Sequence, residues 1–327
     1  MPNLNYAQQW SPELLQILMQ GALTSPFITS NVRWLDAKTF HFTQMSTTGY
    51  KNHKRTGGWN TGSFDQKDVP FTVTHDRDVQ FLVDKADVDE TNATASMQNI
   101  SKTFEQTQVV PETDALFFSR VAQVAQKTEG YHSETAIAAY TKAKVFGMLK
   151  DILAKGKLRR YKANGSLLMY VSSPIMDALE QSTEFTRKIE LTQIAEGGIG
   201  IETRVTDIDG VPIMEVIDDE RFYDAFDWEP AEGGFAPLKK VAADSTHNIE
   251  AVTGAHKINV LVACGQTCKT VPKIASIYYF NPGTHTEGDG YLYQNRSLSD
   301  TFVFPNGRDG KVDSVYVDVD TTEYTGE

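Results

Sequence analysis

Two neighbouring stretches decide the fold: "FTVTHDRDVQFLVDKADVDETN", residues 71–92, and "ISKTFEQTQVVPETDALFFSRVA", residues 100–122. In the first, apolar side chains fall on positions of one parity, which is the period-2 alternation of a half-buried β-strand. These positions are Phe71, Val73, Val79, Phe81 and Val83. In the second, apolar side chains recur at helical spacing. The segment "DVDETN" between them offers acidic residues and a cap, so we expect a strand that leads into a long helix.

The expected helix covers residues 93–127 and would be roughly 50 Å long at 1.5 Å per residue. Its apolar positions run from Met97 and Phe104 to Val124. Pro111 interrupts the pattern. Because proline lacks an N–H group and its ring clashes with the preceding turn, Pro111 indicates either a kink or the first residue of a second helix.

A second β-like run, "AKTFHFTQMST" at residues 37–47, precedes the run at residues 69–85, and together they predict a long hairpin. Between them lies "TGYKNHKRTGGWNTG", residues 48–62, which is basic and glycine-rich in an acidic chain. A hairpin of this length with a polar tip cannot bury its far end in its own domain. We therefore expect it to project from the body of the protein.

The second half of the chain mixes helices and strands. Apolar spacing predicts a helix over about residues 134–154 with Ser133 as its cap. Residues 165–182 are typical of a strand followed by a helix, with Ser173 as the N-cap and Pro174 at the first helical position.

Turn residues place the later strands. Asp209-Gly210 predicts the turn of a hairpin over residues 198–217. Strands are expected at residues 257–265 and 273–280. A last hairpin is expected over residues 300–320, turning at Asn306-Gly307 or Asp309-Gly310.

The length and composition limit the classes to which the protein can belong. The 327 residues are enough for one large domain or two connected ones, and the formal net charge is -12. This acidic balance argues against tight nucleic-acid binding by the whole surface, although a protein can still surround nucleic acid. The N-terminal residues lack a basic signal-peptide region, and no apolar run is long enough for a membrane span. Two cysteines give no disulfide framework, which fits a reducing cytoplasm.

The sequence assigns no catalytic residue, cofactor or metal site. Cys264 and Cys268 are spaced C-x3-C, whereas redox motifs need C-x-x-C and structural zinc needs four ligands, so we interpret them as ordinary thiols. The segment 207–210 resembles the start of a calcium loop but lacks its later ligands. We interpret the glycine-rich segment 283–290, which contains His285, as a turn between strands. No phosphate loop or G-x-S-x-G elbow is present.

One acidic group keeps an enzymatic alternative open. Paired carboxylates could serve an acidic glycosidase or a metal-dependent hydrolase, although a solvated acidic face is the simpler interpretation. The group comprises Asp218, Asp219, Glu220, Asp224 and Asp227. A phage tail or surface binding module is a further alternative, but the helical centre of the chain disfavours it.

The charged cluster "HDRD" also has two interpretations. On a strand, His75 and Arg77 face one way, and Asp76 and Asp78 face the other. Side chains divided between two faces do not converge on one substrate. We therefore expect cross-strand or intersubunit ion pairs.

The order of these elements resembles the major capsid proteins of tailed bacteriophages, which share the Hong Kong phage capsid fold. The resemblance covers nearly the whole chain. It rests on residues 71–92 leading into residues 100–122, similar to the E-loop return strand and the spine helix. It rests also on "GSLLMYVSSPIMDALEQSTEF", residues 165–185, and "DIDGVPIMEV", residues 207–216, which are similar to A-domain elements.

The resemblance implies an α+β fold with an N-arm, a long β-hairpin E-loop, a P-domain with a long spine helix, and an A-domain. It implies the following division: an N-terminal arm at 1–34, the E-loop at 35–75, the first part of the P-domain with the spine helix at 76–129, the A-domain at 130–285, and P-domain return strands at 286–327.

The resemblance also implies a structural protein, not an enzyme, that assembles into pentamers and hexamers of an icosahedral or prolate head around double-stranded DNA. Its partners would be its own copies, a separate scaffolding protein, a portal, a decoration protein, and DNA bound without sequence specificity. It would be located in the virion after assembly in the cytoplasm of a bacterial host. At the E-loop tip, Lys51, Lys54 and Arg55 would meet the acidic surface of an adjacent subunit, with Trp59 as an apolar anchor.

Overall fold

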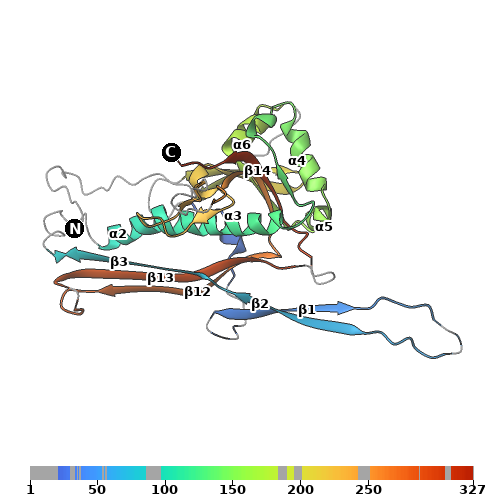
Figure 1. Ribbon diagram of the computed structural model, residues 1–327, viewed down its shortest axis with the longest axis horizontal. Coiled ribbons are helices and arrows are strands. Elements are labelled where there is room, and N and C mark those ends of the chain that lie inside the picture. The colour runs from blue at the N-terminus through green and yellow to red at the C-terminus, as the bar shows by residue number, and fades with distance from the viewer. Residues whose placement is uncertain are drawn as a thin grey trace.

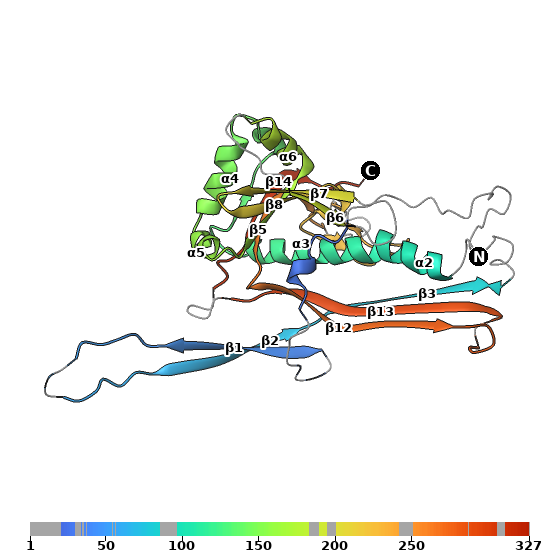
Figure 2. The same cartoon turned by 180° about the vertical axis from the view of Figure 1, so that it is seen from behind.

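In this computed structural model, a helix-bearing body sits on a long rod-like helix, which lies on an extended sheet, and a ribbon projects from one end (Figures 1 and 2). The structure describes residues 21–29, 34, 36, 38–53, 55, 57–85, 97–182, 190–194, 201–241, 251–286, 288–305 and 311–326. The fold is α+β, as predicted.

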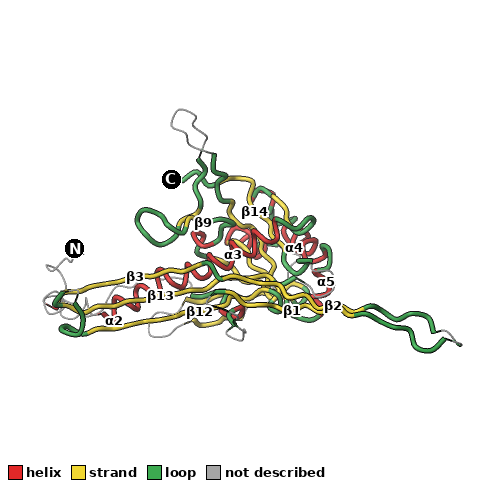
Figure 3. The backbone as a smooth tube through the Cα atoms, turned by 60° about the horizontal axis from the view of Figure 1, so that its bottom comes forward, coloured by secondary structure: helices red, strands yellow, loops and turns green. Residues whose placement is uncertain are grey.

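The projecting ribbon consists of β1 (Thr39–Thr47) and β2 (Phe64–Thr72), which pair antiparallel over their whole length. It extends well beyond the rest of the molecule (Figure 3). At its base, Phe40 and Phe71 pack against Phe302 and Phe304 with ring centroids 5.2–6.4 Å apart. This aromatic cluster anchors one end of the ribbon and leaves the other in solvent.

The pairing predicted for residues 69–85 is wrong in its second half. Those residues form two strands, because β3 (His75–Asp84) pairs with β13 (Gly290–Val303) and not with β1. The chain changes sheets at Thr74, whose N–H and hydroxyl both donate to Asp300 Oδ2 at 3.1 and 2.8 Å. The sheet order is β12-β13-β3, with β12 at Cys268–Phe280.

The long helix is continuous across Pro111. It consists of α2 (Met97–Phe104), the π-helical turn η2 (Glu105–Val109) and α3 (Val110–Gln126). Backbone dihedrals remain helical at Val109 and Val110. The wider π turn ends at Val109, two positions before Pro111, whose ring in a regular α-helix would lie against a carbonyl of the previous turn. Residues 93–96 of the predicted helix lie outside the described part of the chain.

The body is built on a seven-stranded sheet of order β4-β14-β11-β5-β8-β7-β6. In that order the strands are His132–Glu134, Tyr316–Glu323, His256–Cys264, Leu167–Ser172, Val211–Val216, Ile201–Ile208 and Glu190–Ile194. Alternate side chains of β5 point to opposite faces, so Met169 and Val171 join one core cluster and Tyr170 joins another.

Helices cover both faces of this sheet. On one face lie α4 (Val145–Ala154), α5 (Leu158–Ala163) and α6 (Ser173–Glu180). On the other lies α3, which buries Phe117, Phe118 and Val121 against the sheet. Short elements complete the chain: η1 (Ser25–Phe27), η3 (Ile137–Ala139), η4 (Asp219–Arg221) and the strand pair β9 (Phe226–Asp227) and β10 (Ala236–Pro237).

Two predictions from local turn and strand patterns are confirmed. Asp209 and Gly210 have φ values of 53° and 78° and connect β7 to β8 as a tight hairpin turn. Such a turn needs positive φ at both positions, which Asp and Gly tolerate. The strand predicted at residues 257–265 corresponds to β11 (His256–Cys264) apart from its last residue, and the strand predicted at 273–280 lies within β12.

The helix predicted over residues 134–154 is wrong in its first half. Ser133 lies in β4, parallel to β14, and α4 begins only at Val145. The buried carboxylate of Asp318 explains the difference, because it accepts hydrogen bonds from the hydroxyls of Ser133, Thr135 and Tyr140. These bonds to a distant strand are incompatible with a continuous α-helix over the segment, which contains only the short 3-10 helix η3.

Two further boundaries differ from prediction. The hairpin predicted over residues 300–320 is wrong, because β13 and β14 belong to different sheets, and residues 306–310 lie outside the described part. The N-cap of α6 is Ser172, one residue before the predicted Ser173. The Ser173 hydroxyl instead donates to the carbonyl of Val216 at 3.3 Å.

Candidate subunit-contact site

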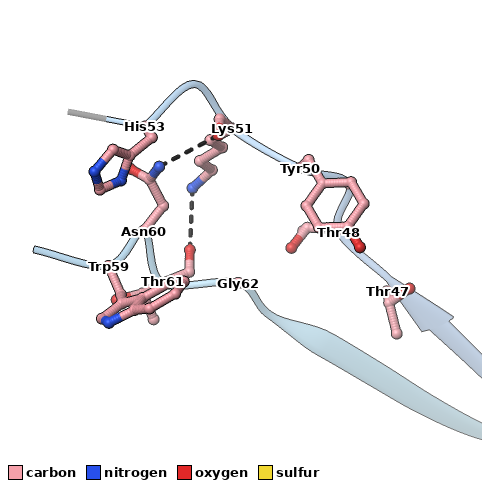
Figure 4. Close-up of a pocket in the computed structure, with 10 residues that line it drawn as sticks. Thr47, Thr48, Tyr50, Lys51, His53, Trp59, Asn60, Thr61 and Gly62 are labelled. Carbon is pink, nitrogen blue, oxygen red and sulfur yellow. Dashed lines mark hydrogen bonds between the residues drawn. The ribbon is translucent and has the colours of Figure 1, made fainter. Parts of the chain in front are cut away.

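The tip of the ribbon, residues 48–62, is the first candidate for a contact with another molecule. Beyond the paired strands, Thr48 N–H donates to Ser63 O at 2.9 Å and Ser63 N–H donates to Thr48 Oγ1 at 3.0 Å. Further out, Lys51 Nζ donates to Thr61 O at 3.2 Å, and Asn60 Nδ2 donates to Asn52 O at 2.9 Å. Hydrogen bonds from side chains thus connect the two sides of the loop beyond the ends of β1 and β2 (Figure 4).

The tip encloses an open hollow of about 900 Å³. Its walls combine apolar, polar and basic side chains: Thr47, Thr48, Tyr50, Lys51, His53, Trp59, Asn60 and Thr61, with Gly49 and Gly62. The Trp59 side chain is 97% exposed, and Tyr50 is fully exposed. Large aromatic side chains held in water at the end of a projection are typical of a surface that another molecule covers.

Of the predicted tip residues, Lys51 and Trp59 line this hollow together, and Arg55 is exposed nearby. Lys54 lies outside the described part of the chain. Two exposed apolar residues of the ribbon were missed by sequence analysis, Met45 and Phe64, at 58% and 73% exposure. The period-2 pattern could have identified them, because both stand on the opposite face of the ribbon from Phe40 and Phe71.

The "HDRD" cluster forms ion pairs inside the chain. His75 Nε2 and Arg77 Nε each lie 2.9 Å from Glu112 Oε1 on α3. On the other face, Asp76 accepts hydrogen bonds from Arg296 at 2.9 and 3.1 Å. The predicted division between two faces is therefore confirmed, and the cross-strand alternative is confirmed for Asp76, whereas His75 and Arg77 pair with a helix. The exposed Asp78 stands opposite Arg296 in the strand register, and an intersubunit role for the cluster remains a prediction.

Arg77 also joins the extended sheet to the body. Its guanidinium donates to the carbonyls of Trp228 and Gly234 in the loop between β9 and β10. The Trp228 ring packs edge-on against His75 at 4.8 Å. These contacts fix the orientation of the sheet, and with it the direction in which the ribbon projects.

The fold has close counterparts among solved structures, although no protein-family model and no curated protein matches the sequence. The mature capsid of bacteriophage PhiM1 matches with TM-score 0.60 and 11% identity over 96% of this chain and 92% of that chain. The capsid of cyanophage P-SCSP1u gives TM-score 0.59 and 11% identity over 97% and 94%. A structure from Mycobacterium phage Che8 gives 0.53 and 11% over 97% and 98%. The chain has a phage capsid fold.

Several residues of the acidic group considered for an enzymatic site have structural contacts. Asp224, expected on a solvated acidic face, is buried and accepts from His256 N–H at 2.7 Å and from Gln126 at 2.7 Å. That interpretation is wrong for Asp224, because a buried carboxylate needs such donors. Asp218 and Asp219 pair with Arg221 and Lys257. Among the described residues, no group of three or more His, Cys, Asp or Glu side chains could hold a metal ion.

The cysteines and the glycine-rich loop agree with prediction. Cys264 and Cys268 are free, buried thiols at the end of β11 and the start of β12. The described residues 283–286, 288 and 289 lie between β12 and β13, and His285 Nε2 lies 2.8 Å from the carbonyl oxygen of Gly290, the first residue of β13. In the part of the chain that the structure describes, no helix is long and apolar enough to span a membrane.

Proposed function

We propose that this chain is the major capsid protein of a tailed bacteriophage. It would self-assemble into pentamers and hexamers of an icosahedral or prolate head that encloses double-stranded DNA. One observation carries the proposal: on a phage capsid fold, a two-stranded ribbon projects into solvent and ends in exposed aromatic side chains.

The limited stability of an isolated ribbon supports this proposal. A two-stranded ribbon without further packing is marginally stable in water, so its distal half gains stability when another molecule covers it. Its end lies far from the other described parts of the chain (Figure 3). The contact is therefore made with another molecule, and identical copies joined head to tail form closed rings.

The proposed division of the chain follows the expected domains. The ribbon β1–β2 would be the E-loop within residues 35–75, and α2 with α3 would be the spine helix within residues 76–129. Most strands of the seven-stranded sheet would form the centre of the A-domain, residues 130–285, and β14 would join that sheet from the C-terminal segment, whereas β12 would pair with the P-domain sheet. Residues 1–34 would be the N-arm, and residues 286–327 would return to the P-domain.

The basic tip suits contact with a like subunit. Lys51, Lys54 and Arg55 belong to a chain with net charge -12, so the surface of a neighbouring copy offers complementary charge. Trp59 would supply the apolar anchor. The role is structural, without catalysis or a cofactor. A scaffolding protein, a portal and a decoration protein would be the other partners, in a virion assembled in the bacterial cytoplasm.

Sedimentation and negative-stain electron microscopy of the purified protein test this proposal. Closed shells, tubes, or rings of five or six subunits are the expected result. Deleting residues 50–61 should abolish closed particles and leave the circular-dichroism spectrum of the subunit unchanged. A monodisperse monomer at high concentration, with or without a scaffold, would overturn the proposal.

A further inference from the structure

The ribbon and the extended sheet each end in two outer strands, and an outer strand presents unpaired backbone N–H and C=O groups along its edge. The ribbon has the outer edges of β1 and β2. The extended sheet has the outer edges of β12 and β3. Over most of their length, no strand among the described residues pairs with these edges.

Two of the four edges carry residues that discourage pairing with another strand. Charges and proline on an edge strand have this effect, since both oppose the approach of a further strand. β2 contains Asp65, Lys67, Asp68 and Pro70 within nine residues. β3 contains Asp76, Arg77, Asp78 and Asp84 within ten residues.

Each of the other two edges has a stretch without such residues. β1, "TFHFTQMST" at 39–47, has no Asp, Glu, Lys, Arg or Pro. β12 is protected in its first half, by Lys269, Pro272, Lys273 and a bulge between Pro272 and Ile274. Its remaining residues, "IASIYYF" at 274–280, are uncharged and rich in β-forming side chains. Because 23% of the residues in the chain are charged, the lack of charge sets β1 and residues 274–280 of β12 apart from β2 and β3.

The strand register identifies the outward-pointing backbone groups of β12. Thr270 O accepts from Thr29 N–H at 2.9 Å, so Thr270 lies on the outer side. Alternation and the single bulge then place the N–H and C=O groups of Ala275, Ile277 and Tyr279 on that side. Ile277 and Tyr279 also expose 47% and 57% of their side chains.

The pairing of β1 with β2 identifies the outward-pointing backbone groups of β1. Lys38 O accepts from Val73 N–H at 2.9 Å, so the even-numbered residues of β1 face β2. The backbone groups of Thr43, Met45 and Thr47 therefore point outward. The base of this edge is covered by the chain's own residue Trp34, which bridges to Phe40. The distal half remains open, beside the exposed side chain of Met45.

We propose that the outer edge of β1 in one copy pairs with the outer edge of β12, residues 274–280, in a second copy. This proposal rests on the proposed function and specifies the surface that receives the ribbon. The two strands of the ribbon and the three of the neighbour's sheet form one sheet of order β2-β1-β12-β13-β3 across the boundary. β1 and residues 274–280 of β12, which lack charge and proline, become internal, and the charged strands β2 and β3 become the edges of the joint sheet.

The directions of the strands fit this arrangement. β1 runs outward to the tip of the ribbon, and β12 runs the opposite way along the molecule (Figure 1). A second copy displaced along the long axis therefore presents an antiparallel pair. Backbone hydrogen bonds along the shared edge would supply affinity, and the exposed side chains Met45, Ile277 and Tyr279 would supply apolar contact.

Proline substitutions test the pairing, because a proline at an outward position removes a donor from the free edge and leaves the pairing within the subunit intact. The variants are Met45→Pro and Ala275→Pro. Matched controls are Gln66→Pro and Asp78→Pro, whose N–H groups point outward on the two charged edges. All four subunits should keep the wild-type spectrum. The first two should need at least tenfold more protein to form particles, and the controls should need the wild-type concentration.

Disulfide trapping provides a test that does not depend on tolerance of proline. Subunits carrying Met45→Cys are assembled with subunits carrying Ala275→Cys, Ile277→Cys or Tyr279→Cys. Paired strands bring opposite Cα atoms within the range of a disulfide, so at least one mixture should give a covalent dimer under mild oxidation. The native cysteines are buried, and Gln66→Cys with Asp78→Cys is the control mixture that should give none.

The outcomes separate the two proposals. Wild-type protein that never forms particles would refute the proposed function. Wild-type particles, together with proline variants that assemble at the wild-type concentration and no dimer in any of the three cysteine mixtures, would overturn the strand pairing alone.

Discussion

Asp114 on α3 and Arg221 in η4 form an ion pair with 3.0 Å between Oδ2 and Nη1, and both side chains are fully buried. The same carboxylate accepts hydrogen bonds from the N–H groups of Leu23 and Thr24 at 3.0 and 3.1 Å, and from the Thr24 hydroxyl at 2.6 Å. One side chain therefore joins the N-terminal segment, the long helix and the loop after β8.

Replacing Asp114 by Ala should destabilise the subunit by about 3–5 kcal/mol, because it leaves the Arg221 charge buried and two backbone donors unsatisfied. Asp114→Asn, which keeps the shape and an acceptor oxygen, should cost less. Urea unfolding of the unassembled subunit measures both effects. Lys162→Ala removes a partly exposed ion pair with Asp209 and serves as the control, expected within ~1 kcal/mol of wild type. A similar value for Asp114→Ala would contradict the interpretation.

Trp59→Ala should separate assembly from folding. The indole is 97% exposed, so its removal should change the free energy of unfolding by no more than about 0.5 kcal/mol. As an anchor at a subunit contact, it should contribute about 2 kcal/mol, which raises the concentration needed for assembly roughly 30-fold. Light scattering during assembly measures this concentration. Normal assembly of the Trp59→Ala variant would exclude the tip as a principal contact.

The Asp76–Arg296 pair should give a pH dependence in the acid range. Hydrogen bonds from Arg296 hold the pKa of Asp76 below its usual value. Because the pKa is depressed in the folded state, the pair contributes to stability above the unfolded pKa, near 4. That contribution is lost as the pH falls through the folded pKa. Carboxyl NMR titration should show the pKa of Asp76 rising in Arg296→Ala. An unchanged titration would mean that the pair does not form in solution.

Both cysteines should be unreactive in the folded subunit. They are fully buried, and burial raises the pKa of the Cys268 thiol to about 12. At pH 8 its thiolate fraction is then about one in ten thousand, and the thiolate is the reactive form. A chromogenic disulfide reagent should therefore find no fast-reacting thiol in native protein and two in guanidinium. A thiol that reacts within seconds in native protein would show that this strand end opens.

The structure agrees with the predictions that rest on patterns among residues close together in the sequence. The alternation of His75, Asp76, Arg77 and Asp78 between two faces follows from the period of a strand. The turn at Asp209-Gly210 follows from the tolerance of these residues for positive φ. The helical centre follows from the spacing of apolar side chains, and the order of these elements was sufficient to identify the resemblance to phage capsid proteins.

The sequence by itself thus determined the class and order of the elements, because strand and helix periods and turn chemistry depend on residues only a few positions apart. Only the tertiary structure decided which strands distant in the sequence pair and which carboxylates are buried. β3 joins β13 rather than β1, and Ser133 meets Asp318 across 185 residues. Strand pairing and charge burial are energetically favourable only once distant segments have packed together, and no local pattern in the sequence records that packing.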